Sequence, residues 1–476
     1  MTVVSRPTGV KSSLGGSYTL PIHPCVHAPA RSVHPWAGEA GTAGRAVVVG
    51  AGKMGLPLAV QFASHGWHVT AVDVNTDVVA AINAGRSQVA GEPGLDEGVA
   101  QTHRAGLLGA TSDAAAAVRD ADVAVLIVPV MLSDDNQPDY RYMDPAVDSI
   151  AGGVHAGLTV IFETTLPIGV TRSRFAPRLE AASGLAAERD FFVAFSPERL
   201  FSGAVFANLA TYPKLVGGIG PESTRRAAAF YDSVLDAEIV AMSSAEAAEF
   251  SKLADTTYRD VNIALANEFA RAADRAGVDI QEVIEAANSQ PYSHIHQPGI
   301  GVGGHCIPVY PHLVLSTDPD LEVVTAARRV NDSQVHRAID AIADALDGLD
   351  GASVLVLGLT YREGVNELAY SQALPLMKGL TDRGAQVYAY DPLLSADEIS
   401  RRGARPYNWG EAAPFRAIVT QTGDALWRSL DFSLFPELQV LLDGRNSARD
   451  VELPASVRYI GIGVQATTRR RAALPY

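Results

Sequence analysis

The chain has 476 residues, a formal net charge of −15 and a hydrophobic fraction of 47%. At roughly 150 residues per domain, this length predicts about three domains. No apolar stretch approaches the roughly 20 residues that cross a bilayer, so membrane insertion is not expected. The negative field disfavours nucleic-acid binding. Two cysteines, Cys25 and Cys306, exclude a disulfide framework and favour a reducing, cytoplasmic setting.

Residues 1–42 are predicted to form a flexible tail. They contain five prolines with scattered glycine and serine, and they show neither helical nor strand periodicity. The continuous apolar segment of a secretory signal is absent. The histidines around Cys25 do not form the four well-spaced ligands of a zinc site, so we expect no bound metal.

A dinucleotide-binding unit is predicted to follow the tail. Residues 46–50 read AVVVG, which is typical of a buried parallel strand, and lead into the GxGxxG sequence GAGKMG. A helix over 58–65 and a strand over 68–72 complete a βαβ unit that ends at Asp73. The Asp73 carboxylate would accept hydrogen bonds from ribose hydroxyls and repel a 2′-phosphate, which favours NAD over NADP. The predicted cofactor-binding residues are Gly50, Gly52, Lys53, Met54, Gly55, Asp73, Pro129 and Thr165.

Further strand ends are expected at the same edge of the sheet. Strands over 123–128 and 158–163 lead into Pro129 and Thr164-Thr165, and a strand over 191–195 precedes Glu198. Ligands of open parallel sheets gather at the carboxyl ends of the strands. Thr165 is therefore a candidate for holding water or substrate, and capping of the following helix is the alternative.

A long helix is predicted from a capping box at Ser243 and Glu246 to Gly277. Its polar positions recur at spacings of three and four and are Lys252, Thr256, Arg259 and Asn262. Flanking apolar residues indicate an enclosed helix, in which a lysine needs an anionic partner or a functional role. A solvated polar stripe is the alternative.

Cys306 follows a segment, residues 298–311, that reads PGIGVGGHCIPVYP. Four glycines before a cysteine are costly unless the chain turns sharply or passes close to a ligand. His305 and exposed backbone donors would favour a reactive thiolate. A small buried hydrophobic side chain is the alternative for Cys306.

The last third of the chain predicts a second α/β unit, with strands over 353–357, 386–390, 417–420, 440–442 and 459–462. The expected fold is α/β, with two Rossmann-like parallel-sheet domains joined by a long central helix and a small helical domain. The predicted bounds are 1–42 for the tail, 43–240 for the NAD-binding domain, 241–340 for the central helical dimerisation domain and 341–476 for a nucleotide-sugar-binding domain.

In order and spacing, the motifs resemble the UDP-glucose/GDP-mannose dehydrogenase family from about residue 45 to 465. They are GAGKMGLPLA, TTLPIG, SPERL, PKLVGG, EFSKLADTTYRDVNIALANE, PGIGVGGHCIPVYP and VLGLTYREGVNEL. The resemblance implies oxidation of the C6 hydroxyl of a nucleotide-linked hexose to a carboxylate by two NAD molecules in sequence. It also implies a homodimer built on the long central helix.

The resemblance assigns the nucleophile to Cys306, which would form a thiohemiacetal and then a thioester. Lys252 would stabilise the negative oxygen of each tetrahedral state. The predicted catalytic residues are Cys306, Lys252, Glu198, Thr165 and Thr256. The predicted substrate-binding residues are Lys252, Arg259, Gly303, Gly304, Arg362 and Lys214.

The chain departs from the family pattern at five positions. Tyr310 replaces an aspartate, Thr256 an asparagine, Ser202 a glutamate, Arg362 a lysine and Ala369 an arginine. The nucleophile and the oxyanion lysine are retained, whereas the groups that handle water and protons are altered. Glu198 and Tyr310 remain as candidates for proton transfer.

We expect a UDP- or dTDP-glucose type of substrate, with a UDP-N-acetylhexosamine as the alternative. Two other function classes stay open. A β-hydroxyacid-type dehydrogenase would share the NAD domain, the long helix and its lysine, but would not need the GGHC segment. A non-catalytic NAD-binding regulatory protein would retain the fold without turnover.

Overall fold

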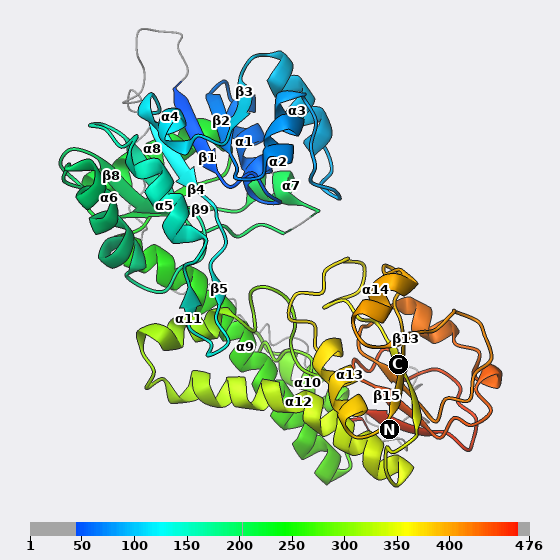
Figure 1. Ribbon diagram of the computed structural model, residues 1–476. Coiled ribbons are helices and arrows are strands. Elements are labelled where there is room, and N and C mark those ends of the chain that lie inside the picture. The colour runs from blue at the N-terminus through cyan, green and yellow to red at the C-terminus, as the bar shows by residue number, and fades with distance from the viewer. Residues whose placement is uncertain (1–43, 202, 465–476) are drawn as a thin grey trace, which may run out of the picture.

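The computed structural model describes residues 44–201 and 203–464. Two α/β units lie at opposite ends of the molecule, and the long helices α9 (Ala245–Ala276) and α12 (Glu322–Leu346) connect them (Figure 1). The predicted fold class is confirmed. The N-terminal tail of the sequence prediction, with Cys25, lies outside the described residues. Within those residues, each helix is too short or too polar to pass through a bilayer.

The first unit is built on an eight-stranded sheet in the order β10-β9-β8-β7-β4-β1-β2-β3. Its neighbouring strands are parallel except for β8 and β9, whose antiparallel pairing was not predicted. The strands are β1 (Arg45–Val49), β2 (His68–Val72), β3 (Leu108–Thr111), β4 (Val123–Leu126), β7 (Thr159–Phe162), β8 (Phe192–Phe195), β9 (Lys214–Gly218) and β10 (Ile239–Ala241). A small hairpin pairs β5 (Met131–Leu132) with β6 (Pro138–Asp139).

Helices cover both faces of this sheet, so successive residues of β1 enter two separate cores. Val48 packs on one face and Val47 and Val49 pack on the other. Burial on both faces explains the unbroken apolar run of the strand. The helices are α1 (Gly55–Ser64), α2 (Thr76–Asn83), α3 (Leu95–Arg104), α4 (Ala114–Arg119), α5 (Met143–Ala151), α6 (Ala176–Ser183), α7 (Val205–Thr211) and α8 (Pro221–Val234).

The second unit has a six-stranded parallel sheet in the order β13-β12-β11-β14-β15-β16. Its strands are β11 (Ser353–Leu357), β12 (Gln386–Tyr390), β13 (Arg405–Pro406), β14 (Ala417–Thr420), β15 (Val440–Asp443) and β16 (Arg458–Gly461). The five predicted strands are therefore confirmed within one residue at each end. The helices α13 (Ala373–Asp382) and α14 (Ala396–Arg401) belong to this unit.

Helix α9 begins one residue later than predicted. Its N-cap is Ser244, whose hydroxyl oxygen accepts a hydrogen bond from the backbone N–H of Ala247 at 3.2 Å. The capping box predicted from Ser243 is therefore wrong. Glu246 forms an ion pair with Arg172 of the first unit, which ties the start of α9 to that unit. Two shorter helices, α10 (Ile280–Asn288) and α11 (Tyr310–Thr317), follow along the chain.

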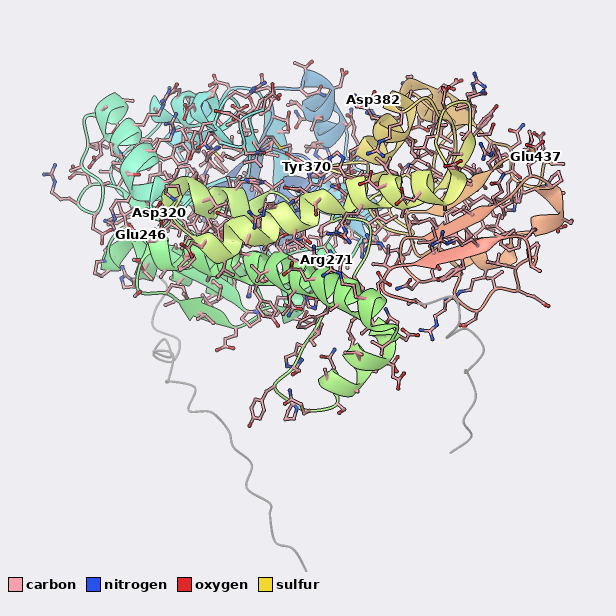
Figure 2. All side chains as sticks on the ribbon, turned by 90° about the horizontal axis from the view of Figure 1, so that it is seen from below. Glu246, Arg271, Asp320, Tyr370, Asp382 and Glu437 are labelled. Carbon is pink, nitrogen blue, oxygen red and sulfur yellow. The ribbon has the colours of Figure 1, made fainter. Side chains whose placement is uncertain are left out.

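A buried polar network fixes α9 against α12, and the two helices run side by side in Figure 2. Arg328 donates to Oδ1 of Asp260 at 2.5 Å, and Asn331 donates to the same oxygen at 2.8 Å. Asn267 donates to the side-chain oxygen of Asn331 and accepts from the backbone N–H of Gly299. The network therefore also fixes the start of the glycine-rich segment.

The prediction of an enclosed α9 is only partly right. The face of α9 that points away from α12 carries four exposed apolar or aromatic side chains. They are Phe250, Tyr258, Leu265 and Phe269, each between 38% and 53% exposed in the single chain. Their spacing of eight, seven and four residues places them along one stripe. This stripe is apolar and open, whereas the side of α9 that bears Lys252 is covered.

A buried ion pair lies inside the first unit. Lys214 on β9 is 3.0 Å from Glu163, which directly follows β7. The hydroxyl of Tyr231 donates to the same carboxylate oxygen, and the lysine stacks over the tyrosine ring. Both charged side chains are shielded from water, so each charge depends on the other for stabilisation.

We expect Lys214→Met to lower the free energy of unfolding of the NAD-binding unit by about 3–5 kcal/mol, because it leaves the Glu163 carboxylate buried without its cation. Urea unfolding followed by circular dichroism measures the change. Lys378→Met, which breaks an exposed ion pair with Asp382, is the matched control and should cost less than about 1 kcal/mol. Equal stability losses in the two variants would contradict the assignment.

Candidate active site

The predicted dinucleotide loop connects β1 to α1. Gly50 adopts φ +99°, which other residues rarely adopt. A Cβ atom on Gly55 would lie 1.8 Å from the carbonyl oxygen of Gly50, so strand and helix approach each other only because Gly55 lacks a side chain. A Cβ atom on Gly52 would meet no protein atom within 4 Å. The loop therefore offers an open backbone surface at a helix N-terminus, which fits a pyrophosphate.

Asp73 follows β2 beside this loop. Its Oδ2 accepts a hydrogen bond from the backbone N–H of Ala51, and its Oδ1 accepts one from Asn75, both at 2.9 Å. These bonds orient the carboxylate and leave acceptor positions on both oxygens. The residues present therefore fit a dinucleotide whose ribose bears free hydroxyls. Lys53 is exposed and Met54 partly buried in the same loop.

Thr164 and Thr165 follow β7, where the ends of β4 and β7 meet. The Thr164 hydroxyl donates to the carbonyl oxygen of Val128 at 2.6 Å, directly before Pro129. Thr165 is 7% exposed and donates to the hydroxyl of Tyr310 at 3.1 Å. The threonine pair is thus placed between the NAD-binding unit and α11.

Glu249 of α9 holds the loop that carries these threonines, a role that the sequence did not reveal. It accepts hydrogen bonds from the backbone N–H groups of Gly169 and Thr171, where a π-helical turn, Thr171–Phe175, begins. Burial raises the pKa of Glu249 to about 7 despite these donors.

The glycine-rich segment packs against the second α/β unit. Gly301 and Gly304 adopt φ values of +69° and +94°. The N–H of Gly304 donates to the carbonyl oxygen of Ala369 at 3.0 Å, and a Cβ on Gly303 would lie 3.0 Å from Tyr361. The close approach that the glycines permit is therefore to protein. Substrate contact by Gly303 and Gly304 stays a prediction.

Cys306 lies one turn before α11, and its carbonyl oxygen accepts from the N–H of Tyr310 at 2.9 Å. The thiol is free and partly buried. Burial of Tyr310, and then the negative charge of the Cys306 sulfur, raise the pKa of Tyr310. Lys252 of α9 is 7% exposed, and its Nζ is 5.6 Å from the centre of the Tyr310 ring. The thiol, the lysine and the tyrosine therefore gather from two helices and the turn between the glycines and α11.

Glu198 completes this group from the end of β8. Burial raises the pKa of its carboxyl group, and the nearby positive charge of Lys252 opposes the rise. A raised pKa makes a carboxylate a better proton acceptor. Thr256 is buried one turn after Lys252 on α9.

Other predicted substrate residues lie outside this group. Arg259 and Arg362 are exposed, and the Arg362 guanidinium lies 5.8 Å from the ring centre of Tyr361. Lys214 takes part in the buried ion pair with Glu163. Their contact with a substrate stays a prediction. Ser202, a departure from the family pattern, lies outside the described residues.

Glu367 of the second unit forms ion pairs with the dinucleotide loop and with the segment that carries Cys306, and these contacts were not predicted. Oε2 of Glu367 is 3.1 Å from Nζ of Lys53 in the dinucleotide loop and 3.4 Å from Nε2 of His305, the neighbour of Cys306. Tyr370, three residues after Glu367 in the chain, is labelled in Figure 2 where the second unit faces the first. Glu367 is more than 300 residues from Lys53, so sequence spacing carried no signal for this contact.

The chain matches three family models. They describe the NAD-binding, central and UDP-binding domains of the UDP-glucose/GDP-mannose dehydrogenase family at residues 44–235, 246–333 and 355–450. The chain therefore belongs to this family. It is an NAD-dependent nucleotide-sugar dehydrogenase, and the prediction of NAD as the cofactor is confirmed.

Similar proteins cover nearly the whole chain. A UDP-N-acetyl-D-mannosamine dehydrogenase of Pyrococcus horikoshii is 34% identical over 88% of this chain and 99% of its own length. An NDP-N-acetyl-D-galactosaminuronic acid dehydrogenase of Ralstonia nicotianae is 32% identical over 84% of this chain and 95% of its own length. A solved UDP-N-acetyl-D-mannosamine dehydrogenase structure from Pyrococcus horikoshii superposes with a TM-score of 0.78 at 33% identity, over 88% of this chain and 99% of that one.

We expect Asp73→Ser to raise the KM for NAD about tenfold and to narrow the preference for NAD over NADP, because the charged acceptor for the ribose hydroxyls is lost. Initial rates with each dinucleotide measure both effects. Asp77→Ser, an exposed change in the first turn of α2, is the control. Unchanged selectivity in the Asp73 variant would contradict the assigned role.

Proposed function

We propose that the protein oxidises the C6 hydroxyl of a nucleotide-linked hexose to the carboxylate through a thioester on Cys306. The observation that carries this proposal is the convergence of Cys306, Lys252 and Glu198 with the strand end at Thr165. A soft nucleophile, a cation for a developing oxyanion and a proton acceptor are the groups that this reaction needs.

In this proposal the dinucleotide loop and Asp73 hold NAD, which accepts one hydride in each of the two oxidations. Thr165 orients the reacting end of the sugar at the edge of the sheet. Glu249 of α9 holds the loop that carries Thr165. The partial burial of Cys306 limits competing water during the first oxidation.

The sulfur of Cys306 attacks the aldehyde carbon, and Lys252 stabilises the negative charge that forms on the aldehyde oxygen. After the second oxidation, water attacks the thioester while Glu198 takes its proton. The carbon–sulfur bond breaks with its electron pair on the sulfur, and the carboxylate leaves. Because the nucleophile must stay reduced, we also propose a reducing compartment such as the cytoplasm.

For the sugar, we propose a UDP-linked 2-acetamido hexose. The names of the Pyrococcus and Ralstonia relatives support this choice over the UDP- or dTDP-glucose expected from the sequence. A glucose nucleotide is the competing candidate, because a UDP-glucose dehydrogenase of Pyrobaculum islandicum shares the fold at 26% identity and a TM-score of 0.79.

We expect the wild-type enzyme to form close to two NADH per sugar nucleotide, because alcohol and aldehyde are oxidised in turn. Cys306→Ala should form no acid and at most one NADH. Absorbance at saturating NAD, with products separated by anion exchange, measures both. The test panel is UDP-N-acetylmannosamine, UDP-N-acetylglucosamine, UDP-glucose, dTDP-glucose and GDP-mannose.

The outcomes of this assay separate the function classes. One NADH with free aldehyde from the wild type would refute the four-electron reaction. Full activity of Cys306→Ala would indicate a β-hydroxyacid-type dehydrogenase. NAD binding by calorimetry without NADH from any member of the panel would indicate a regulatory protein.

We also propose that the protein is a homodimer joined through α9. Phe250, Tyr258, Leu265 and Phe269 support this, since they form an exposed apolar stripe on the longest helix of the chain. Such a stripe is stable in water when a second copy covers it.

We expect Leu265→Asp to convert the dimer to monomers, because the substitution places a charge in the middle of the apolar stripe. The mass measured by light scattering after size exclusion should be about 100 kDa, twice the chain mass, for the wild type. It should fall to 50.2 kDa, the mass of one chain, for the variant. Asp255→Asn, an exposed change elsewhere on α9, should leave the mass unchanged. A wild-type mass of one chain would contradict the proposal.

A further inference from the structure

Tyr310 occupies the space between the candidate nucleophile and the loop after β7. Its hydroxyl accepts a hydrogen bond from Thr165 at 3.1 Å, and its backbone N–H donates to the carbonyl oxygen of Cys306, one turn earlier in the chain, at 2.9 Å. The Lys252 ammonium lies on the face of its ring, 5.6 Å from the centre. A single residue therefore contacts residues from the NAD-binding unit, from α9 and from the segment before α11.

The protonation state of Tyr310 restricts what this hydroxyl can do. Burial of the hydroxyl, and then the negative charge of the Cys306 sulfur, raise its pKa well above the usual value for tyrosine. The phenol therefore keeps its proton at neutral pH and cannot serve as a general base. It remains a hydrogen-bond donor.

The contact with Thr165 sets the direction of that donation. The Thr165 hydroxyl donates to the phenol oxygen and occupies one of its acceptor positions. The phenolic hydrogen is then free to point at the sulfur of Cys306. A hydrogen bond from this phenol to the sulfur would complete a chain of donors that begins at Thr165 and ends on the atom that carries negative charge in a thiolate.

We propose that Tyr310 is a catalytic residue that donates a hydrogen bond to the sulfur of Cys306 whenever that sulfur is a thiolate. This inference rests on the proposed function. In the free enzyme the bond stabilises the nucleophile. In thioester hydrolysis the carbon–sulfur bond breaks, its electron pair moves to the sulfur, and the bond from Tyr310 stabilises the departing thiolate. The phenolic proton stays on oxygen throughout.

Several charged groups lie around Tyr310 and Cys306. Lys252 and Glu198 interact electrostatically within the site. His305 precedes the cysteine and faces Glu367 of the second unit. Replacement of tyrosine by phenylalanine leaves all four groups and the ring in place, and it removes only the hydroxyl, which is the proposed donor to the sulfur and the acceptor for Thr165.

The test compares thiol reactivity in enzyme without substrate. In a Cys25→Ser background, the rate of Cys306 alkylation by iodoacetamide is followed from pH 5 to pH 10 by peptide mass spectrometry. We expect Tyr310→Phe to move the midpoint of the pH profile upward by about one unit, because a hydrogen bond to a charged group is lost. Tyr370→Phe, a nearby tyrosine outside the group, is the matched control.

An identical midpoint in the Tyr310→Phe variant and its parent would overturn the proposal. If that variant does not fold, as judged by circular dichroism, Thr165→Val removes the directing hydroxyl and should also move the midpoint upward. An unshifted midpoint in Thr165→Val would then overturn it.

Turnover separates this inference from the proposed function. If the parent enzyme forms two NADH per sugar, Tyr310→Phe should lower kcat by about ten- to a hundredfold with little change in the KM for NAD. A shifted alkylation profile in a protein that oxidises no nucleotide sugar would refute the function alone. Normal turnover with an unshifted profile would refute the role of Tyr310 alone.

Discussion

The close packing of the glycine-rich segment on the second α/β unit is the constraint on which the site depends. The N–H of Gly304 bonds to Ala369, and no room remains for a side chain at Gly303. Two residues later the chain reaches Cys306, so the position of the thiol is set by backbone contacts. Glycine costs conformational entropy in a loop, and these contacts offset that cost. The proposed nucleophile is thereby held between the units that match the NAD-binding and UDP-binding domains of the family.

The site also shows how an acidic protein accommodates anionic ligands. The net charge of −15 is distributed over the whole chain, whereas the buried cation Lys252 lies over the ring of Tyr310, which is close in the chain to the proposed nucleophile Cys306. In a partly desolvated site a local charge outweighs distant ones. Not every buried cation has this purpose, because Lys214 neutralises Glu163 within the first unit.

The sequence predicted the fold well because both sheets are buried on both faces, which leaves unbroken apolar strands such as β11 and β14. It missed the antiparallel pairing of β8 with β9, since the local pattern of a short strand does not reveal its direction. Within the candidate site, Cys306 was predicted from the unusual glycine-rich segment, and Lys252 was predicted from the spacing of polar residues on an otherwise apolar helix. Glu249 and Glu367 were missed because their roles depend on contacts with residues about 80 and 300 positions away.

The central claim is that Cys306 carries the substrate as a thioester. The most direct measurement uses Glu198→Gln, which lacks the proposed acceptor for the proton of water, so that hydrolysis is slowed. After reaction with NAD and the nucleotide sugar, the enzyme is quenched in acid and its peptides are weighed. The account predicts that the peptide with Cys306 gains the mass of the sugar-nucleotide acyl group and loses it in hydroxylamine. An unmodified Cys306 peptide from an enzyme that has formed NADH would contradict it.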